Sequence, residues 1–365
     1  MTTLRIVAAQ SDLAHALGAI RPAISARPSH PILSTVLIAV EPGRATLTGF
    51  DLSVGISATI AAETASTGRV ALPYNLLAPL VAKLPDGAIT VEVDGDHGMI
   101  SSASGSYRLA AADPDDYPDV LTPGAAATVA ALPAIELQAA IAATQHAASR
   151  DESQQILQGI SLCATAEAIE AATTDGHRLS VYGPCRAADV PRVTIPAAVL
   201  RHIAGLTGDT ITLTRDESVV RFSDGRSTIT TRTIDGTFPN YRQLIPATFK
   251  HDAIIDRRGL MAALNRVAVI ADQYNNVVKL TIKDGELIIR AEIQDVGSGA
   301  ETMLVDAASN AECSFNARYL LDGLKVIQTK HVRLRMNTAT TPVVLEPVDS
   351  DTMQVYLIMP IQVRA

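Results

Sequence analysis

The sequence contains no tryptophan, and aromatic residues make up only 4% of its 365 residues. Proteins that coat single-stranded nucleic acid stack the bases on aromatic side chains, so this scarcity argues against that class. Cysteine is also scarce, and Cys163, Cys185 and Cys313 show no Cys-x-x-Cys spacing. This pattern excludes a disulfide framework and a cysteine zinc knuckle, and it is typical of a protein from a reducing cytosol.

Long apolar runs are missing too. The longest stretch without a charged residue, residues 120–135, has 16 residues and is interrupted by two prolines and a glycine. A membrane-spanning helix needs about 20 apolar residues. The first residues also lack the apolar core of a signal peptide. We therefore expect a cytoplasmic protein with no membrane partner.

What is present is a core-forming composition with an acidic balance. Apolar residues make up 47% of the chain and charged residues 19%, which is typical of a globular protein. At roughly 100–200 residues per domain, the length predicts two or three domains. The net charge of −8 argues against a protein that coats DNA with a basic surface.

Residues that could support metal or catalytic chemistry do not converge. None of the eight histidines lies three or four residues from another, and no phosphate-binding loop ending in Gly-Lys-Ser or Gly-Lys-Thr occurs. His177 and Ser180 are an odd number of residues apart, so a strand would point them to opposite faces. We expect no catalytic residues, no metal and no cofactor, and hence a protein that is not an enzyme.

The sequence repeats itself at an interval of about 120 residues. Short apolar segments lead into a helix signal at Pro73, Pro196 and Asn316, which are 123 and 120 residues apart. Proline is favoured at the first helical position and asparagine at the N-cap. A second set of helix starts recurs at intervals of 122 and 123 residues, at Ser11, Pro133 and Asp256.

Between the helix signals the apolar residues alternate with a period of two. Residues 88–93, 210–214 and 277–282 show this alternation, which is typical of half-buried strands. Asp-Gly pairs indicate hairpin turns between such strands. They stand at 94–95, 224–225 and 284–285.

Each repeat is therefore predicted to contain the series strand, helix and three strands twice in succession. A period of this length indicates a tandem of whole domains, because solenoid repeats are much shorter. We predict an α+β fold of three similar domains, each with two helices packed on antiparallel sheets. The expected domains are residues 1–122, 123–248 and 249–365.

Charge is unevenly distributed between the predicted helices and the rest of the chain. The helices contain 11 Lys and Arg residues against 5 Asp and Glu residues, so they carry +6 and the remainder carries −14. Such residues often occupy a solvated helix face. The alternative is a positive surface that faces DNA phosphates and binds duplex DNA without sequence preference. The predicted helices are residues 11–27, 74–86, 134–150, 197–206, 256–271 and 316–330.

Five motifs lie in register on this repeat and span the chain in order. They are Arg-Pro-Ser-His-Pro-Ile-Leu at 27–33, Asp-Pro-Asp-Asp-Tyr-Pro at 113–118, Thr-Asp-Gly-His-Arg-Leu at 174–179, Phe-Pro-Asn-Tyr-Arg-Gln-Leu-Ile-Pro at 238–246 and Tyr-Leu-Ile-Met-Pro at 356–360. Any one of them is weak, but together they resemble the bacterial sliding-clamp family, the beta subunits of DNA polymerase III.

The resemblance implies a ring-shaped head-to-tail homodimer with the DNA clamp fold. In this family, helices line a hole that holds duplex DNA and sheets form the outer wall. The implied function is that of a processivity factor, which tethers the DNA polymerase III alpha subunit to its template. Further implied partners are the clamp loader, repair polymerases and other proteins with a clamp-binding motif.

The resemblance also implies a hydrophobic groove that binds a short linear peptide from these partners. Leu, Met and Pro side chains would form its apolar floor, and Met adapts to different shapes. His177 and Arg178 would offer polar contacts at the rim. The matching positions are Leu157, Thr174, Gly176, His177, Arg178, Leu179, Pro239, Gln243, Leu244, Leu357, Met359, Pro360 and Ile361.

The chain departs from the family pattern at two positions beside this groove. Gln243 and Gln362 stand where the family usually has basic residues. The lost charge leaves an alternative open, namely a diverged clamp paralogue that serves a restricted partner such as a repair polymerase or plasmid replication.

Two further sets of positions follow from the resemblance and the charge pattern. Tyr107 and Leu109 in the first domain, with Val269 and Ile270 in the third, match the dimer interface. The residues expected to face DNA are Arg21, Arg27, Lys83, Arg150, Arg201, Arg266, Arg318 and Lys325.

Overall fold

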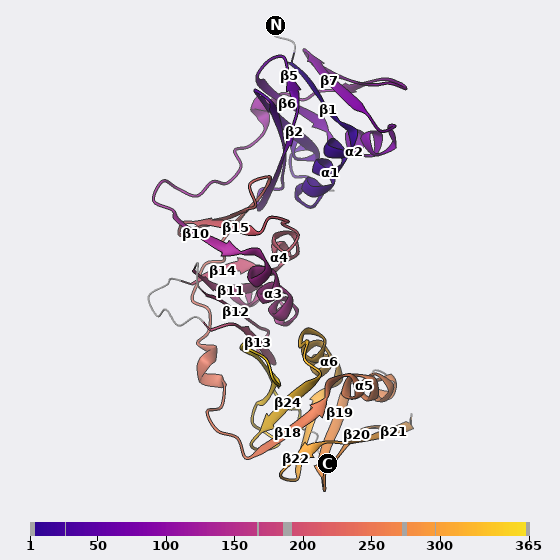
Figure 1. The fold of residues 1–365 in the computed structure, drawn as a ribbon, viewed down its shortest axis with the longest axis vertical. Coiled ribbons are helices and arrows are strands. Elements are labelled where there is room, and N and C mark those ends of the chain that lie inside the picture. The colour runs from indigo at the N-terminus through magenta and orange to yellow at the C-terminus, as the bar shows by residue number, and fades with distance from the viewer. Residues whose placement is uncertain are drawn as a thin grey trace. The chain divides into compact units, whose positions relative to one another are not determined.

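The structure, a computed structural model, describes residues 4–25, 27–165, 168–184, 192–271, 276–295 and 297–362 (Figure 1). The chain divides into two compact units. Unit 1 comprises Met1–Ala134 and Gly205–Thr233, and unit 2 comprises Ile135–Ala204 and Ile234–Ala365. The second predicted repeat is thus shared between the units, and the predicted domain borders stay a prediction.

Helices form at all six predicted places, but only the fifth reaches its predicted end, and the first and third fall furthest short. Pro22 lacks a backbone N–H, and after Ile20 the chain forms the 3₁₀ turn η1 (Arg21–Ala23). Another 3₁₀ turn, η4 (Gln145–Ala147), ends the third helix. Arg21, Arg27, Arg150 and Lys330 therefore lie outside the helices, which corrects their predicted placement. The helices are α1 Gln10–Ile20, α2 Tyr74–Lys83, α3 Ala134–Thr144, α4 Ala197–Ile203, α5 Arg257–Ala271 and α6 Ala317–Val326.

The helix starts follow the predicted signals to within a residue. Pro73 and Pro196 are N-cap residues and not the first helical residues. Asn316 caps α6, because its Oδ1 accepts from the N–H of Arg318 at 3.0 Å. Asp256 Oδ1 likewise accepts from the N–H of Gly259 at 2.6 Å at the start of α5.

Unit 1 contains two antiparallel sheets. The first has the strand order β5-β1-β7-β8-β9, and the second has β10-β15-β16-β17-β4-β3-β2-β6. Pairing of β4 with β17 (Ile56 opposite Ile229) joins the first and second repeats in one sheet. The strands are β1 Leu4–Ala9, β2 Thr35–Glu41, β3 Arg44–Phe50, β4 Val54–Ala61, β5 Glu63–Thr64, β6 Gly68–Pro73, β7 Ala88–Asp94, β8 His97–Ser102, β9 Gly105–Ala110, β10 Thr128–Pro133, β15 Thr210–Arg215, β16 Val219–Ser223 and β17 Ser227–Arg232.

Unit 2 repeats this arrangement. Its larger sheet has the order β14-β11-β12-β13-β26-β25-β24-β18-β22, and its smaller sheet has β21-β20-β19-β23. Pairing of β13 with β26 joins the second and third repeats. The strands are β11 Gly159–Ala164, β12 Ile169–Thr174, β13 Arg178–Tyr182, β14 Val193–Pro196, β18 His251–Asp256, β19 Val277–Lys283, β20 Glu286–Ile293, β21 Gly297–Leu304, β22 Asp306–Ala307, β23 Ala311–Asn316, β24 His331–Met336, β25 Val343–Pro347 and β26 Gln354–Ile358.

The predicted strands and hairpin turns are confirmed. β7, β15 and β19 cover the three alternating segments. At the turn between β19 and β20, Asp284 and Gly285 have φ values of 52° and 81°, as a two-residue hairpin requires. The sheets are antiparallel throughout the described residues, and the α+β prediction therefore holds.

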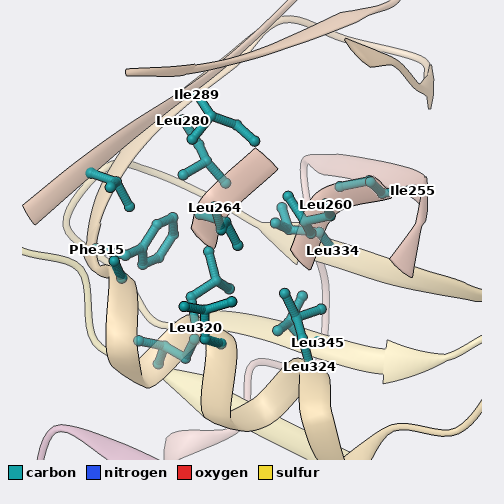
Figure 2. Close-up of a cluster of buried hydrophobic side chains, with 14 of the residues drawn as sticks. Ile255, Leu260, Leu264, Leu280, Ile289, Phe315, Leu320, Leu324, Leu334 and Leu345 are labelled. Carbon is teal, nitrogen blue, oxygen red and sulfur yellow. The ribbon is translucent and has the colours of Figure 1, made fainter. Parts of the chain in front are cut away.

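The core of the third repeat lies between α5, α6 and the sheets (Figure 2). Leu264 of α5, Leu320 of α6 and Phe315 of β23 are all at most 1% exposed. Burying side chains of this size stabilises the fold by about 1.5–3 kcal/mol each. This packing holds α6 firmly, which matters below because α6 carries part of the candidate site.

The cysteine prediction needs one correction. Cys163, at the end of β11, is disulfide-bonded, whereas Cys313 is a free, buried thiol whose pKa burial raises to about 11. Cys185 lies outside the described residues. Among the described residues no helix is both long and apolar enough to cross a membrane.

Candidate functional site

One aspartate builds the turn between β12 and β13. Asp175 Oδ1 accepts hydrogen bonds from the backbone N–H groups of His177 and Arg178, both at 3.0 Å. Gly176 has a φ of +86°, in the left-handed region that favours glycine. Its N–H donates to Thr174 Oγ1 at 3.1 Å. The turn leaves the His177 side chain exposed.

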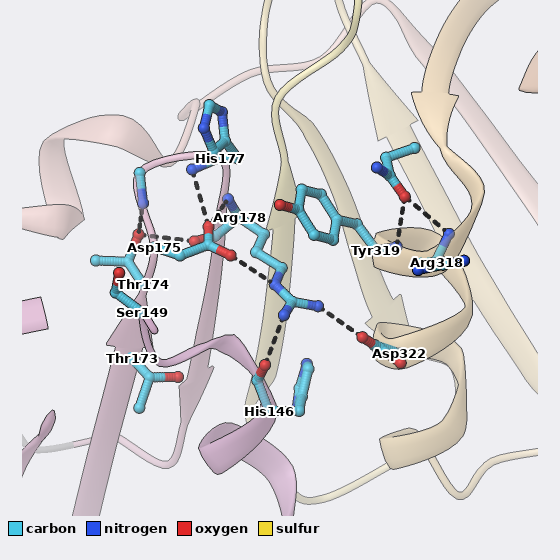
Figure 3. A network of polar contacts seen from close by, with 12 residues as sticks. His146, Ser149, Thr173, Thr174, Asp175, His177, Arg178, Arg318, Tyr319 and Asp322 are labelled. Atoms are coloured by element: carbon cyan, nitrogen blue, oxygen red, sulfur yellow. Dashed lines mark hydrogen bonds and ion pairs between the residues drawn. The ribbon is translucent and has the colours of Figure 1, made fainter. Parts of the chain in front are cut away.

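Arg178 is the centre of a polar network (Figure 3). Its side chain is only 11% exposed. Nε donates to Asp175 Oδ2 at 2.9 Å, Nη1 to Asp322 Oδ2 at 2.8 Å, and Nη2 to the carbonyl oxygen of His146 at 2.7 Å. The guanidinium is thus held by partners from three elements, and its role as a polar contact for a bound peptide stays a prediction.

Tyr319 of α6 covers the same guanidinium. The Arg178 Cζ atom lies 4.4 Å from the centroid of the Tyr319 ring, a cation–π distance. The His177 ring also stacks on the Tyr319 ring, with 6.4 Å between the two ring centroids. Burial alone would lower the pKa of Arg178, but Tyr356, Asp322 and Asp175 together raise it. The arginine therefore stays charged and holds the turn against α6.

The ring of His146 lies buried next to this network. Neither of its ring nitrogens has a hydrogen-bond partner among the described residues. Its ring lies 5.3 Å from the ring of Tyr356. Burial, reinforced by the charge of Arg178, lowers the pKa of His146 to about 4. The imidazole is therefore neutral at physiological pH.

The end of β26 runs beside the turn. In the β13–β26 register, Leu179 is opposite Leu357. Beyond the strand, the N–H of Met359 donates to the carbonyl oxygen of His177 at 2.8 Å, and the N–H of Ile361 donates to that of Ser314 at 2.8 Å. These bonds fix the path of the segment that carries Met359, Pro360 and Ile361.

An apolar floor lies next to this segment. Leu179 and Leu357 are 1% and 2% exposed, and they belong to one cluster with Tyr241. We call Leu179 and Leu357 the groove floor. Tyr241 opens the 3₁₀ turn η6 (Tyr241–Leu244), and Phe238 and Ile245 on either side of η6 also pack on the cluster.

Exposed apolar side chains occur on segments that adjoin the cluster of the groove floor in sequence. Leu244 of η6 is 52% exposed and Met359 is 38% exposed, and Pro239 and Gln243 are also exposed. We call η6 with Pro239 the groove wall. Large apolar side chains left half in water are typical of a surface that binds a partner.

A cavity of about 700 Å³ opens at the polar side of the turn. Its lining includes Ser149, Gln154, His177, Tyr319 and Asp322. Leu157, in the 3₁₀ turn η5 (Gln155–Gln158), is half-buried behind this lining, and its carbonyl oxygen accepts from the N–H of Ser149 at 2.8 Å.

The groove positions expected from the resemblance stay a prediction. All the predicted groove residues belong to unit 2. Tyr319 and Asp322 were missed, although the Asn316 cap predicts the start of α6 and so places them on one helix face three residues apart. Ser180 is buried and donates to the carbonyl oxygen of Ala143 at 2.7 Å, away from His177. In the described part of the chain, no group of three metal-binding side chains occurs.

The basic residues expected to face DNA are all exposed, but not all are unpaired. Arg266 donates to both carboxylate oxygens of Glu301, at 2.7 and 2.8 Å, and Lys325 lies 3.5 Å from Asp322. Within the observed helices seven Lys and Arg residues stand against three Asp and Glu residues. The observed helices therefore carry a net charge of +4, compared with +6 for the predicted helices.

Two of the residues matched to the dimer interface lie on an edge strand, and the other two lie on helix α5. Tyr107 (41% exposed) and Leu109 (9%) lie on β9, the edge of the five-stranded sheet. Val269 on α5 is 66% exposed, and Ile270 packs partly on the core beside Gly299 of β21, which is the edge strand of the four-stranded sheet.

Comparison with known proteins identifies the family to which this chain belongs. Models of the N-terminal, central and C-terminal domains of the DNA polymerase III beta subunit match residues 4–122, 131–240 and 242–362. The chain belongs to the DNA polymerase III beta subunit family. It is 37% identical to the beta sliding clamp of Synechococcus elongatus and 34% identical to that of Synechocystis, with 98% or more of every chain covered.

Solved structures agree with this family assignment. A Pseudomonas aeruginosa sliding clamp bound to griselimycin superposes with a TM-score of 0.92 at 25% identity, covering 99% of this chain and all of that one. A Bartonella birtlesii clamp gives a TM-score of 0.91 at 28% identity, with 99% and 100% covered. Neither comparison favours the restricted-paralogue alternative.

Proposed function

We propose that this protein is a DNA sliding clamp, a homodimeric processivity factor that encircles duplex DNA and tethers the polymerase III alpha subunit and other clients. The observation that carries the proposal is the exposed apolar surface of Leu244 and Met359 above the groove floor, in a chain of the beta subunit family. A client peptide would place apolar anchor side chains on this floor.

The link to DNA requires no chemistry by this chain. A closed ring leaves a circular duplex only by opening, so weak electrostatic attraction gives long residence, and tethering raises the effective concentration of the polymerase at the primer end. Arg21, Arg27, Lys83, Arg150 and Arg201 are exposed and suited to phosphates. The pairing of Arg266 with Glu301 makes that residue a weaker contributor.

Ring closure would use the two edge strands described above. Edge strands present unpaired N–H and C=O groups that pair readily with another chain. β9 of one copy, with Tyr107 and Leu109, would meet α5 and β21 of the next, with Val269 and Ile270. This gives a head-to-tail homodimer, with each seam of standard size or larger, roughly 1,600 Å² in total.

The decisive test is retention on DNA of different topology. The protein is loaded by the clamp loader of its own host, with ATP, onto nicked circular DNA, which is then cut once. We expect the protein to stay on the circle and to run off the linear product. Equal retention on both would show direct DNA binding, and a folded dimer that never loads would favour the restricted paralogue.

A further inference from the structure

Glu170 is a buried carboxylate on β12, only 3% exposed. Its partners come from two other segments. Arg242 Nη2 donates to Oε1 at 2.9 Å and to Oε2 at 2.8 Å, the hydroxyl of Tyr241 donates to Oε1, and Arg192 forms an ion pair with it. Burial, followed by the bond to Glu170, raises the pKa of Tyr241, which therefore remains a donor.

A buried ion pair is a poor way of gaining stability. Removing charges from water costs about as much as their attraction returns, and well-packed apolar residues often replace such a pair without loss. What the pair provides is direction, because a carboxylate accepts from a guanidinium and a hydroxyl only in defined positions. Glu170 therefore fixes where Tyr241 and Arg242 lie, and both belong to η6.

η6 is the element that forms the groove wall. Tyr241 packs in the same cluster as Leu179 and Leu357, and Leu244 follows three residues later. η6 is a single 3₁₀ turn that begins at Tyr241 and ends at Leu244. Bonds that fix Tyr241 and Arg242 therefore also limit where the exposed Leu244 can lie.

We propose that Glu170 is a positioning residue for the peptide groove, acting through the Tyr241 hydroxyl and Arg242 to hold Leu244 at its place above Leu179 and Leu357. The proposal rests on the proposed function, because it concerns the same groove. A rigid wall lowers the conformational cost of binding. Client affinity should therefore depend on a carboxylate that touches no client.

The test is a double-mutant cycle on the full-length dimer, with a labelled peptide from the clamp-binding segment of the host alpha subunit as probe. Glu170→Gln should weaken binding about tenfold, or about 1.4 kcal/mol. In the Leu244→Ala background, the same change should weaken binding less than about twofold, because the side chain that Glu170 positions is gone. Equal losses in both backgrounds would overturn the proposal.

Two further variants separate positioning from general stability. Tyr241→Phe removes only the hydroxyl and keeps the packing, and it should weaken peptide binding roughly threefold. This variant tests the proposal even if Glu170→Gln folds poorly. Glu136→Gln removes another carboxylate that accepts a tyrosine hydroxyl in unit 2, that of Tyr182 at 3.0 Å, and it should leave affinity unchanged. Unchanged affinity in Tyr241→Phe, or an equal loss in Glu136→Gln, would overturn the positioning role.

The same experiment distinguishes failure of the proposal from failure of the proposed function. If the wild-type dimer does not bind the peptide at all, the groove is not a client site and the clamp function itself is wrong. If the wild type binds and Glu170→Gln binds equally well, only the role of Glu170 is wrong.

Discussion

Arg178 Nη1 and Asp322 Oδ2 lie 2.8 Å apart, although the two residues are separated by 144 positions in sequence. The arginine is the first residue of β13 and the aspartate belongs to α6, so this ion pair connects the second repeat to the third inside unit 2. The arginine side chain is only 11% exposed, so water would replace a lost aspartate poorly.

We therefore expect Asp322→Asn to destabilise the protein by about 1–3 kcal/mol, the usual loss when a buried charged group loses a charged partner. Urea unfolding monitored by circular dichroism measures the change. Lys325→Ala removes the exposed neighbour of the same aspartate and serves as the control, with an expected change within about 0.5 kcal/mol. Equal stability of Asp322→Asn and the wild type would contradict the role given to this pair.

Met359→Ala should weaken client binding by about tenfold or more, because an apolar contact of a few kcal/mol leaves the groove. Deletion of residues 359–365 should have a larger effect. The dimer should persist in both, since neither change touches the strands of the seam. Fluorescence anisotropy gives the affinity and light scattering gives the mass. A monomeric mass for Met359→Ala would show that this residue supports assembly.

Ile270→Arg should convert the dimer into a monomer. The change places a charge at the proposed seam, where it has no partner, and such a charge costs several kcal/mol. Ile135→Arg offers a control at another apolar helix position, 79% exposed, and should remain dimeric. Sedimentation velocity at micromolar concentration distinguishes the monomer from the dimer. A dimeric Ile270→Arg would move the seam elsewhere.

The pH dependence of stability should carry a contribution from His146. Its pKa falls from 6.5 to about 4 on folding, so the unfolded chain takes up a proton that the native imidazole resists. Stability is therefore lost as the pH falls from about 6.5 towards 4. The charged groups around the ring are Arg178, Asp322, Asp175 and Lys325, and Tyr356 packs against it.

Between pH 7.5 and pH 5 this loss should reach about 2 kcal/mol. It is measured by urea unfolding at both values. His146→Leu should remove the loss while keeping a neutral side chain in the same space. A variant with the pH dependence of the wild type would assign the effect to other groups.

Much of the fold could be predicted because residues with defined backbone preferences recur at the same place in each repeat. Pro73, Pro196 and Asn316 mark helix starts by what their rings and side chains can do, and the structure confirms all three within a residue. The helix ends were harder. They depend on where the chain turns back onto the sheet, and residues 21–27 carry no period that reveals this.

The site was predictable in composition but not in the roles of its charges. The network around Arg178 was not predicted, because Asp322 and Tyr319, which contact its guanidinium, come from α6, far away in the sequence. The role of Glu170 could not be predicted, since the partners of this lone acid in an apolar strand, Arg242 and Tyr241, reach it only in the folded chain. The disulfide of Cys163 could not be inferred from spacing either.

The sheets of the second repeat continue into both neighbouring repeats. Its strand β17 pairs with β4 of the first repeat, and its strand β13 pairs with β26 of the third. A fragment cut at the predicted borders, residues 123–248, would expose both strands along their full length as open edges. We expect such a fragment to aggregate when expressed alone, so this chain should be truncated only where a sheet ends.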